Sequence, residues 1–332
     1  MMYKMTIAFF IACASTTWIA FGAEPTDAPT YTDPNDVDAD FAIQGEYSGE
    51  IPTEFGPERW GIQVVALGQG KFMATGYRGG LPGDGGTKRE ETRAYGDRKG
   101  NVVELLAEDV ATLVIADGKM KVFSPDGDEE YGTLKRVHRK SPTLGAKPPE
   151  GAIVLFDGNS LDYWDGNTSK TDDGLLTEGS TSTKKGRSYK AHVEFRLPYM
   201  PESRGQARGN SGFYVQGRYE IQMLDSFGLD GESNECGGAY GAAPPNLNMC
   251  FPPLSWQTYD VDFTAPEFKN GKKIKNARLT VRHNGVVIHD DRELSSHTPG
   301  GVDEESADPG VLMFLQNHSN PVRYRNIWVV EQ

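Results

Sequence analysis

Polar and apolar positions alternate over short stretches from Phe41 to the C-terminus, and clusters of Gly, Pro, Asn and Asp separate these stretches. Alternation with a period of two is typical of β-strands that bury one face, and no long stretch sustains the helical spacing of apolar residues. Asn284-Gly285 stands between the alternating runs ARLTVRH and VVIHDD and is the strongest hairpin signal in the chain. The pattern predicts an all-β protein.

A first group of strands is predicted between residues 41 and 140, with hairpin turns at Asp117-Gly118 and Asp126-Gly127. The Gly-rich stretch GYRGGLPGDGG does not follow the strand–loop–helix order of a phosphate-binding loop, so we expect an irregular loop there. The group predicts a small antiparallel β domain to which the sequence assigns no role. The Pro-rich, polar residues 141–150 form the predicted linker, with the domain boundary near residue 145.

Residues 151–332 contain the second group of strands, in runs such as YKAHVEFRLPY, SGFYVQG, RYEIQMLD, QTYDVDFTAP and VRYRNIWVVE. Strands at this spacing, without amphipathic helices between them, predict a two-sheet antiparallel sandwich. Most aromatic and aliphatic side chains of this part are then expected in its core.

The chain begins with a segment that is typical of exported proteins. Lys4 precedes an apolar run that ends in small residues at Ala23, which predicts a signal peptide over residues 1–23 and a periplasmic or extracellular location. A retained membrane anchor is disfavoured because the run is short, and a lipoprotein modified at Cys13 is the weaker alternative. Residues 24–40 are acidic and Pro-rich, so a disordered lead-in is predicted. No later stretch is apolar enough to cross a bilayer.

Charge and motifs exclude several functions. The 332 residues include 47 acidic and 34 basic side chains, for a net charge of -13. Nucleic-acid binding requires clustered Lys and Arg, so a nucleic-acid partner is not expected. The sequence also lacks a nucleophile elbow, a zinc motif and a dinucleotide-binding fingerprint.

Two cysteines, Cys236 and Cys250, bracket a loop rich in Gly, Pro and Asn. In an exported chain this arrangement predicts a disulfide, and closing a loop of about 15 residues contributes about 3 kcal/mol in the chain-entropy model. The alternative, a metal-binding pair, lacks the C-x-x-C spacing and a nearby His.

Strand alternation also indicates which polar side chains share a face. Such faces are often no more than solvated surface, but here they carry His, Glu, Gln, Asn and Arg. Planar hydrogen-bonding groups beside aromatic rings suit a saccharide, whose hydroxyl groups need several polar partners. The residues concerned are His192 and Glu194 on one predicted strand, Glu220 and Gln222 on another, Gln316 with His318, Arg323, and the aromatic residues Tyr240 and Trp256. We expect Glu194, Glu220 and Gln222 to form one polar face, with Tyr240 of the Cys-bracketed loop lying over it.

The spacing Glu220-x-Gln222-x-x-Asp225 has a further consequence. Simple alternation places Asp225 on the opposite face, whereas one bulged residue would return it to the side of Gln222. Two carboxylates on one face would then match the arrangement that glycoside cleavage uses.

From Gly151 to Val330 the chain resembles the 3-keto-disaccharide hydrolase domain family. The phrases that carry this resemblance are IVLFDGNSLDYW, HVEFRLPY, GNSGFYVQGRYEIQMLDSFG, NECGGAYGAAPPNLNMCFPPLSWQTYDVDF, ARLTVRHNGVVIHDD and LQNHSNPVRYRNIWVV. The resemblance implies a concanavalin-like jelly-roll sandwich and cleavage of glycosides that carry a ketone at sugar carbon 3. By motif it points to Glu194, Asn210, Glu220, Gln222, Asp225, His318 and Arg323.

A ketone at carbon 3 acidifies the proton on carbon 2, so elimination needs a base, an acid and a group that holds the enolate oxygen. His192 or His318 is the candidate base and Glu194, Glu220 or Asp225 the candidate acid. Arg323 or a divalent cation is the candidate enolate stabiliser, and no other cofactor is expected. Two alternatives stay open: a carbohydrate-binding module without turnover, and a glycosidase that acts on unoxidised glucans.

Overall fold

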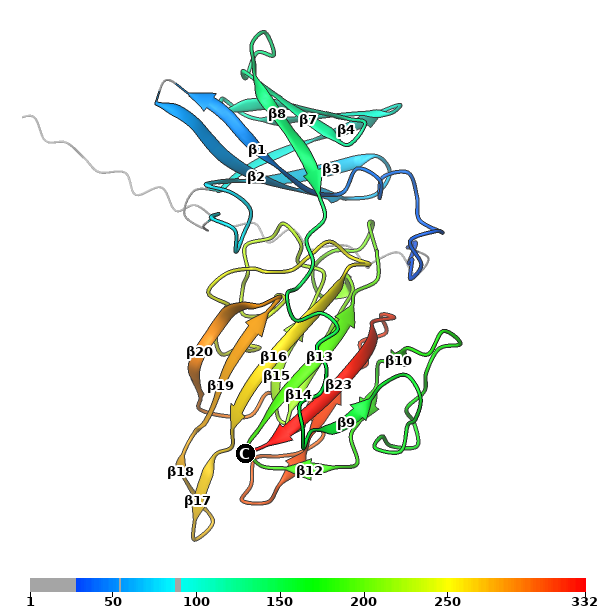
Figure 1. The fold of residues 1–332 in the computed structure, drawn as a ribbon, viewed down its shortest axis with the longest axis vertical. Coiled ribbons are helices and arrows are strands. Elements are labelled where there is room, and N and C mark those ends of the chain that lie inside the picture. Colours follow the sequence, from blue (N-terminus) through cyan, green and yellow to red (C-terminus); the bar gives the residue numbers. More distant parts are fainter. Residues whose placement is uncertain (1–27, 54, 87–90) are drawn as a thin grey trace, which may run out of the picture.

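The computed structural model describes residues 28–53, 55–86 and 91–332 (Figure 1). It is built of antiparallel β-sheets, as the alternation of apolar and polar residues predicts. The predicted signal peptide lies outside the described residues. Within them, no helix is long and apolar enough to cross a membrane.

The first eight strands form a closed barrel, drawn in blue to green-cyan in Figure 1. Each strand pairs with the next one along the chain, and β1 also pairs with β8 to close the barrel. Alternate side chains of every strand point inward, where they form an apolar core. The strands are β1 Gly45–Thr53, β2 Gly56–Ala66, β3 Lys71–Arg78, β4 Glu91–Lys99, β5 Val102–Ala107, β6 Ala111–Ala116, β7 Lys119–Phe123 and β8 Glu130–Val137.

The second part of the chain is a two-sheet sandwich, which confirms the predicted fold class. The larger sheet has the order β10-β23-β13-β16-β19-β20, with β9 paired to β23, and the smaller sheet has the order β11-β22-β14-β15. The larger sheet comprises β9 Ile153–Phe156, β10 Leu176–Thr177, β13 Tyr189–Arg196, β16 Trp256–Thr264, β19 Ala277–His283, β20 Val286–Leu294 and β23 Arg323–Glu331. The smaller sheet comprises β11 Ser180–Thr181, β14 Ser211–Val215, β15 Tyr219–Met223 and β22 Met313–Leu315.

Two pairs of short strands and one 3-10 turn lie outside the barrel and the two sheets of the sandwich. Strand β12 (Lys185–Gly186) pairs with β21 (Gly310–Val311), and β17 (Glu267–Lys269) pairs with β18 (Lys272–Lys275). One 3-10 turn covers Gly205–Ala207.

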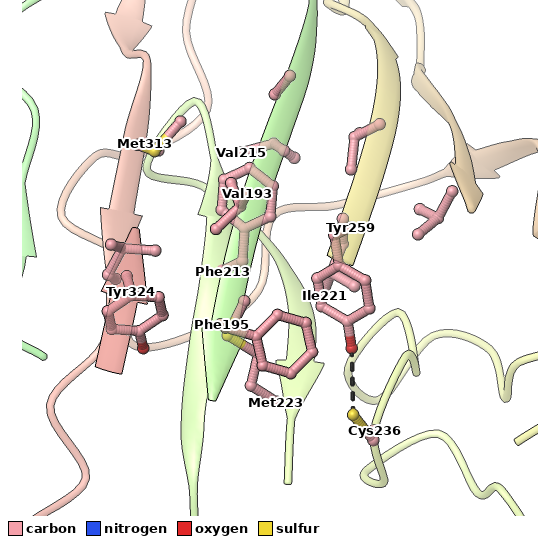
Figure 2. Packing of buried hydrophobic residues seen from close by; sticks show 14 of the residues in the cluster. Val193, Phe195, Phe213, Val215, Ile221, Met223, Cys236, Tyr259, Met313 and Tyr324 are labelled. Carbon is pink, nitrogen blue, oxygen red and sulfur yellow. Dashed lines mark hydrogen bonds between the residues drawn. The ribbon is translucent and has the colours of Figure 1, made fainter. Parts of the chain in front are cut away.

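The core of the sandwich lies between its two sheets. Val193 and Phe195 of β13 pack there with Ile221 and Met223 of β15 and with Tyr259 of β16, and Figure 2 shows these side chains meeting. Because successive side chains of a strand point to opposite faces, the residues between them point outward. The sandwich therefore has two outer faces, one on each sheet.

The barrel packs on the sandwich, and the chain before the barrel packs on both. Val65 and Met73, from outward positions of the barrel, belong to the sandwich core cluster. Tyr31 forms a bridge with Tyr199. Asp40 is buried, where it accepts hydrogen bonds from the backbone N–H of Gly70 and from Arg98. The prediction of a disordered lead-in is therefore wrong for residues 28–40, because aromatic and carboxylate side chains that were counted as solvated find partners in both parts of the fold.

Candidate functional site

The outer face of the smaller sheet carries a row of aromatic and acidic side chains. Phe314 of β22 lies opposite Tyr214 of β14, and Tyr214 lies opposite Glu220 of β15. In the next row, Gly212 lies opposite Gln222. The backbone N–H of Gln316, just after β22, donates to the carbonyl oxygen of Gly212. Three strands thus bring Glu220, Gln222 and Gln316 onto one face, as their alternation predicts.

The Glu220 carboxylate lies over Gly212. A Cβ atom at position 212 would overlap Oε1 of Glu220, so the absence of a side chain there makes room for the carboxylate. The Tyr214 hydroxyl is 2.9 Å from Oε2 of Glu220 and 3.0 Å from the carbonyl oxygen of Pro299. This hydroxyl has one proton. It therefore donates to Glu220 when the carboxylate is ionised, and it can accept from Glu220 and donate to Pro299 when the carboxyl is protonated.

Burial changes the acidity of this carboxyl. Glu220 is 4 % exposed. Burial raises its pKa to about 7, and the hydrogen bond from Tyr214 opposes this rise only in part. Burial and the neighbouring Glu220 carboxylate also raise the pKa of Tyr214, so its hydroxyl keeps its proton. A carboxyl with a pKa near neutrality can both accept and donate a proton at that pH.

A chain of amides continues the polar face beside Glu220. Gln222 Nε2 donates to Oε1 of Gln206 at 3.1 Å, and Asn210 Nδ2 donates to the same oxygen at 3.2 Å. Oδ1 of Asn210 is buried and has no hydrogen-bond partner among the described residues. Gln206 is half-buried, so this chain reaches the surface. Buried amides held in this way can present fixed donors and acceptors to sugar hydroxyl groups.

The predicted binding residue Tyr240 lies at the edge of the same face. Its backbone N–H donates to the carbonyl oxygen of Glu220, so the segment around Tyr240 extends the sheet beyond β15. Tyr240 is also close enough to Tyr214 to contribute to the rise in its pKa. On the other side, Nε2 of Gln316 lies 3.4 Å from the Tyr214 hydroxyl. Tyr240 and Gln316, both half-buried, therefore border the Glu220–Tyr214 pair.

His192 and Glu194 lie on the outer face of the other sheet, so the structure does not bring them to Glu220. The connection between barrel and sandwich covers them there, and both are buried. Nδ1 of His192 is 2.6 Å from Oδ1 of Asp260, and the backbone N–H of Gly145 donates to Oε1 of Glu194 at 2.5 Å. Arg325 Nε donates to Oε2 of Glu194 at 2.7 Å. These contacts fix the connection onto the larger sheet.

The pKa values of Glu194 and His192 fit a structural role. Burial opposes ionisation of Glu194, but hydrogen bonds from His192, from the side chains of Asn326 and Arg325 and from the Gly145 N–H outweigh burial and lower its pKa to about 2. Burial also opposes protonation of His192, but its carboxylate neighbours raise its pKa. A carboxylate that stays ionised, with both oxygens already accepting hydrogen bonds, is a poor proton donor at neutral pH. The prediction that Glu194 shares a face with Glu220 is wrong.

Asp225 also lies away from Glu220. Arg208 Nε donates to its Oδ2 at 2.7 Å, and both side chains are buried. The Arg208 guanidinium also reaches the carbonyl oxygen of Ala66 in the barrel. Asp225 therefore helps to join the two parts of the chain, and the predicted pair of carboxylates on one face is wrong.

The remaining predicted residues lie elsewhere or at the margin. The ring of Trp256 packs against the guanidinium groups of Arg325 and Arg196 on the larger sheet. Arg323 forms an ion pair with Glu178 at 2.7 Å. His318 is exposed in the loop that follows Gln316. Among Trp256, Arg323 and His318, only His318 is near the Glu220 face in sequence, two residues after Gln316.

Cys236 and Cys250 are free thiols in the structure, so the predicted disulfide is not formed in it. Both are buried. The Tyr259 hydroxyl donates to the carbonyl oxygen of Gln222 at 2.6 Å. It also lies 3.3 Å from Sγ of Cys236, and a dashed line in Figure 2 marks this second contact. The loop is held by packing and by the bonds of segment 237–240 to β15, which the sequence spacing of the cysteines does not reveal.

Tyr214, Gly212 and Gln206 were not predicted as site residues. Tyr214 and Gly212 lie at outward positions of the run SGFYV, so alternation could have placed Tyr214 opposite Glu220 and Gly212 opposite Gln222 once the pairing of β14 with β15 was known. In the part of the chain that the structure describes, no three His, Cys, Asp or Glu side chains gather closely enough to hold a metal ion.

Comparisons with known proteins find one family and two solved structures that are similar to part of the chain. Residues 151–330 match the profile of a family described as the 3-keto-alpha-glucoside-1,2-lyase-like domain. A candidate glycosyl hydrolase from Parabacteroides distasonis ATCC 8503, solved at 2.13 Å, is similar with 31 % identity and a TM-score of 0.51, over 55 % of this chain and 85 % of that one. Another candidate glycosyl hydrolase from that strain, solved at 1.70 Å, has 18 % identity and a TM-score of 0.41, over 55 % and 94 %. No curated protein sequence matches the chain.

Proposed function

The chain belongs, through residues 151–330, to the 3-keto-alpha-glucoside-1,2-lyase-like domain family, and from this premise we propose that it cleaves 3-keto-glycosides by elimination followed by addition of water. Family membership and the similar candidate glycosyl hydrolase support a carbohydrate hydrolase in general. The observation that supports the finer proposal is the single carboxyl of Glu220, with a pKa of about 7, on the polar face of the smaller sheet.

The reaction has two stages. In the first, a base takes the proton from carbon 2. The electron pair of that C–H bond forms a double bond between carbons 2 and 3, the π pair of the carbonyl moves to the carbon 3 oxygen, and an enolate results. The enolate then re-forms the ketone, a double bond forms between carbons 1 and 2, and the glycosidic oxygen leaves with a proton. In the second stage water adds across this double bond, with its hydroxyl on carbon 1 and its proton on carbon 2. The net result is hydrolysis.

Glu220 can serve as the base of the first stage and as the acid that protonates the leaving oxygen. At a pH near its pKa of about 7, both protonation states of the carboxyl are populated. The Tyr214 hydroxyl, 2.9 Å away, can donate to the carboxylate before the proton transfer and turn to the Pro299 carbonyl afterwards. Glu220 is nearly covered, so the substrate's carbon 2 must approach between the groups that border it, such as Tyr240 and Gln316.

Neutral donors border the carboxyl. Gln316 Nε2 lies 3.4 Å from the Tyr214 hydroxyl, and the amides of Gln222 and Asn210 continue the face. We assign to these amides the binding of sugar hydroxyls and of the enolate oxygen, because donors fixed before the reaction stabilise charge that develops during it. This assignment replaces Arg323, which is paired with Glu178.

The position of the other carboxylates favours elimination over ordinary glycoside hydrolysis. Retaining and inverting glycosidases use two carboxyl groups on either side of the scissile bond. Of the carboxylates predicted from the sequence, only Glu220 lies on this face, whereas Glu194 faces the connection and Asp225 is bound by Arg208. One group that exchanges a single proton suffices for elimination.

Export through the apolar segment 1–23 is part of the proposal, since a saccharide outside the cell would then meet the enzyme there.

The test is to incubate the purified protein with a 3-keto-glucoside and with its unoxidised parent and to measure release of the aglycone. We expect cleavage of the keto compound alone. Glu220→Gln should lower the rate by about a hundredfold or more, the scale of lost acid–base catalysis. Glu194→Gln is the matched control and should keep the rate while folded.

Cleavage of the unoxidised glucoside would favour an ordinary glycosidase. Binding of either sugar without any cleavage would favour a carbohydrate-binding module.

A further inference from the structure

The barrel contains a cavity of about 330 Å³ at the end where β1 and β2 are joined. The other end of the barrel is filled: Tyr47, Phe72 and Met120 are buried in its core, and Tyr199 of the sandwich packs against them. The cavity therefore lies away from the sandwich and from Glu220. Its lining consists of Ile51, Pro52, Thr53, Glu58, Trp60, Ile62, Ala74, Gly76, Thr92, Ala94, Ala107, Val110, Ala111, Leu113, Val122 and Tyr131.

The cavity exists because successive strands place small residues at inward positions. Ala74 of β3 is opposite Ala94 of β4, and Ala107 of β5 is opposite Ala111 of β6. A Cβ atom added to Gly76 would have no neighbour nearer than 3.7 Å. Strands usually carry β-branched and aromatic residues, and an eight-stranded barrel is just wide enough for such side chains to fill it. The four neighbouring strands β3 to β6 each place an alanine against the cavity, and these small side chains leave this part of the barrel interior unfilled.

The wall and the rim of the cavity differ in chemistry. The wall is made of alanines and of aliphatic side chains such as Ile62, Leu113 and Val122. At the rim, Trp60 Nε1 donates to Oε2 of Glu58 at 3.2 Å, and Glu58 also forms an ion pair with Arg78 at 2.5 Å. The charged groups at the rim are thus bound to each other, and the wall offers no charge to a ligand. Such a space selects an uncharged, apolar molecule.

We propose that the barrel binds one small, uncharged, apolar molecule in this cavity, with an aromatic or alkyl body against the alanines and its more polar end near Trp60. A cavity of about 330 Å³ falls at the lower end of the range for ligand pockets. Its volume admits one small molecule, and a folded protein or a polysaccharide is too large for it. This function is independent of the cleavage proposed for the sandwich.

The experiment measures binding of N-phenyl-1-naphthylamine, an uncharged aromatic probe whose fluorescence rises in apolar surroundings. The intact protein should bind it saturably at one site. Decan-1-ol should displace it if alkyl chains fit, and naphthalene should displace it if only rings fit, whereas glucose should not displace it. Absence of saturable binding, or displacement by glucose, would overturn the proposal.

Variants locate the binding site. Ala94→Leu with Ala111→Leu fills the cavity and should weaken binding at least tenfold, with a melting temperature that is unchanged or higher. Gly76→Ala adds one methyl group that has room, and should keep the fold and weaken binding less. Ala116→Leu changes the outward face of β6 and is the matched control. Undiminished binding by the cavity-filling variants, or an equal loss in Ala116→Leu, would show that the probe binds elsewhere.

Discussion

Replacing Glu220 by glutamine should change how the stability of the protein depends on pH. The carboxyl is 4 % exposed, and burial raises its pKa from 4.5 to about 7. The folded state therefore holds a proton on Glu220 over a pH range in which the unfolded chain has released it. The favourable contribution of this group is complete below about pH 4.5 and is lost as the pH rises to about 7. Glutamine has the same shape and no such titration.

The size of this change in the free energy of unfolding follows from the pKa shift of Glu220. One pKa unit corresponds to about 1.4 kcal/mol, so a rise from 4.5 to about 7 corresponds to about 3 kcal/mol. The free energy of unfolding of Glu220→Gln minus that of the natural protein should thus increase by about 3 kcal/mol from pH 4 to pH 8. Other titrating groups cancel in this difference, because both proteins contain them. The variant should be the more stable protein at pH 8, although it has lost the carboxyl that we propose to be catalytic.

Urea unfolding of both proteins at pH 4, 6 and 8, followed by circular dichroism, measures this difference. Glu293→Gln, at an exposed position on the larger sheet, is the control and should give a difference that is nearly constant with pH. If the difference for Glu220→Gln is also constant, the carboxyl is not buried with a raised pKa. Glu220 would then not be the acid and base that we propose.

Two further predictions concern the groups around this carboxyl and the joint between barrel and sandwich. Gly212→Ala should displace the Glu220 carboxylate and lower kcat/KM on a 3-keto-glucoside by about a hundredfold, because a shift of about 1 Å in a catalytic group has that effect. An unchanged rate would show that the carboxylate need not lie over Gly212. Asp225→Asn leaves the Arg208 charge buried without its partner and should lower the free energy of unfolding, measured in urea, by about 3–5 kcal/mol. Asp84→Asn, from an exposed ion pair, should lower it by about 1 kcal/mol or less. Equal losses would show that the Arg208–Asp225 pair contributes no more than an exposed pair.

Strand alternation predicted the sandwich and the outward direction of several polar side chains correctly. Glu220 and Gln222 do share a face, and so do His192 and Glu194, because side-chain direction depends only on the local period of two. The sheet to which each strand belongs depends on pairing between distant segments. The expected common face of Glu194 and Glu220 is therefore wrong, because β13 and β15 belong to different sheets.

Other features were missed because they arise from long-range packing. Gly145 and its neighbours looked like a polar linker, yet the backbone N–H of Gly145 donates a hydrogen bond to the buried Glu194. Residues 28–40 looked too polar to fold, yet Asp40 is bound by Arg98. Closure of the first eight strands into a barrel depends on the pairing of β1 with β8, which no local pattern marks.

The route of cleavage can be tested directly by running the reaction in D₂O and examining carbon 2 of the released 3-keto sugar by mass spectrometry and NMR. Elimination removes the original proton from carbon 2, and addition of water places a solvent deuteron there. We therefore predict one deuterium at carbon 2 in the product formed by the natural protein, beyond the exchange seen when the free product is incubated with Glu220→Gln. Product that keeps its original hydrogen at carbon 2, while the glycosidic bond is cleaved at full rate, would contradict elimination through Glu220.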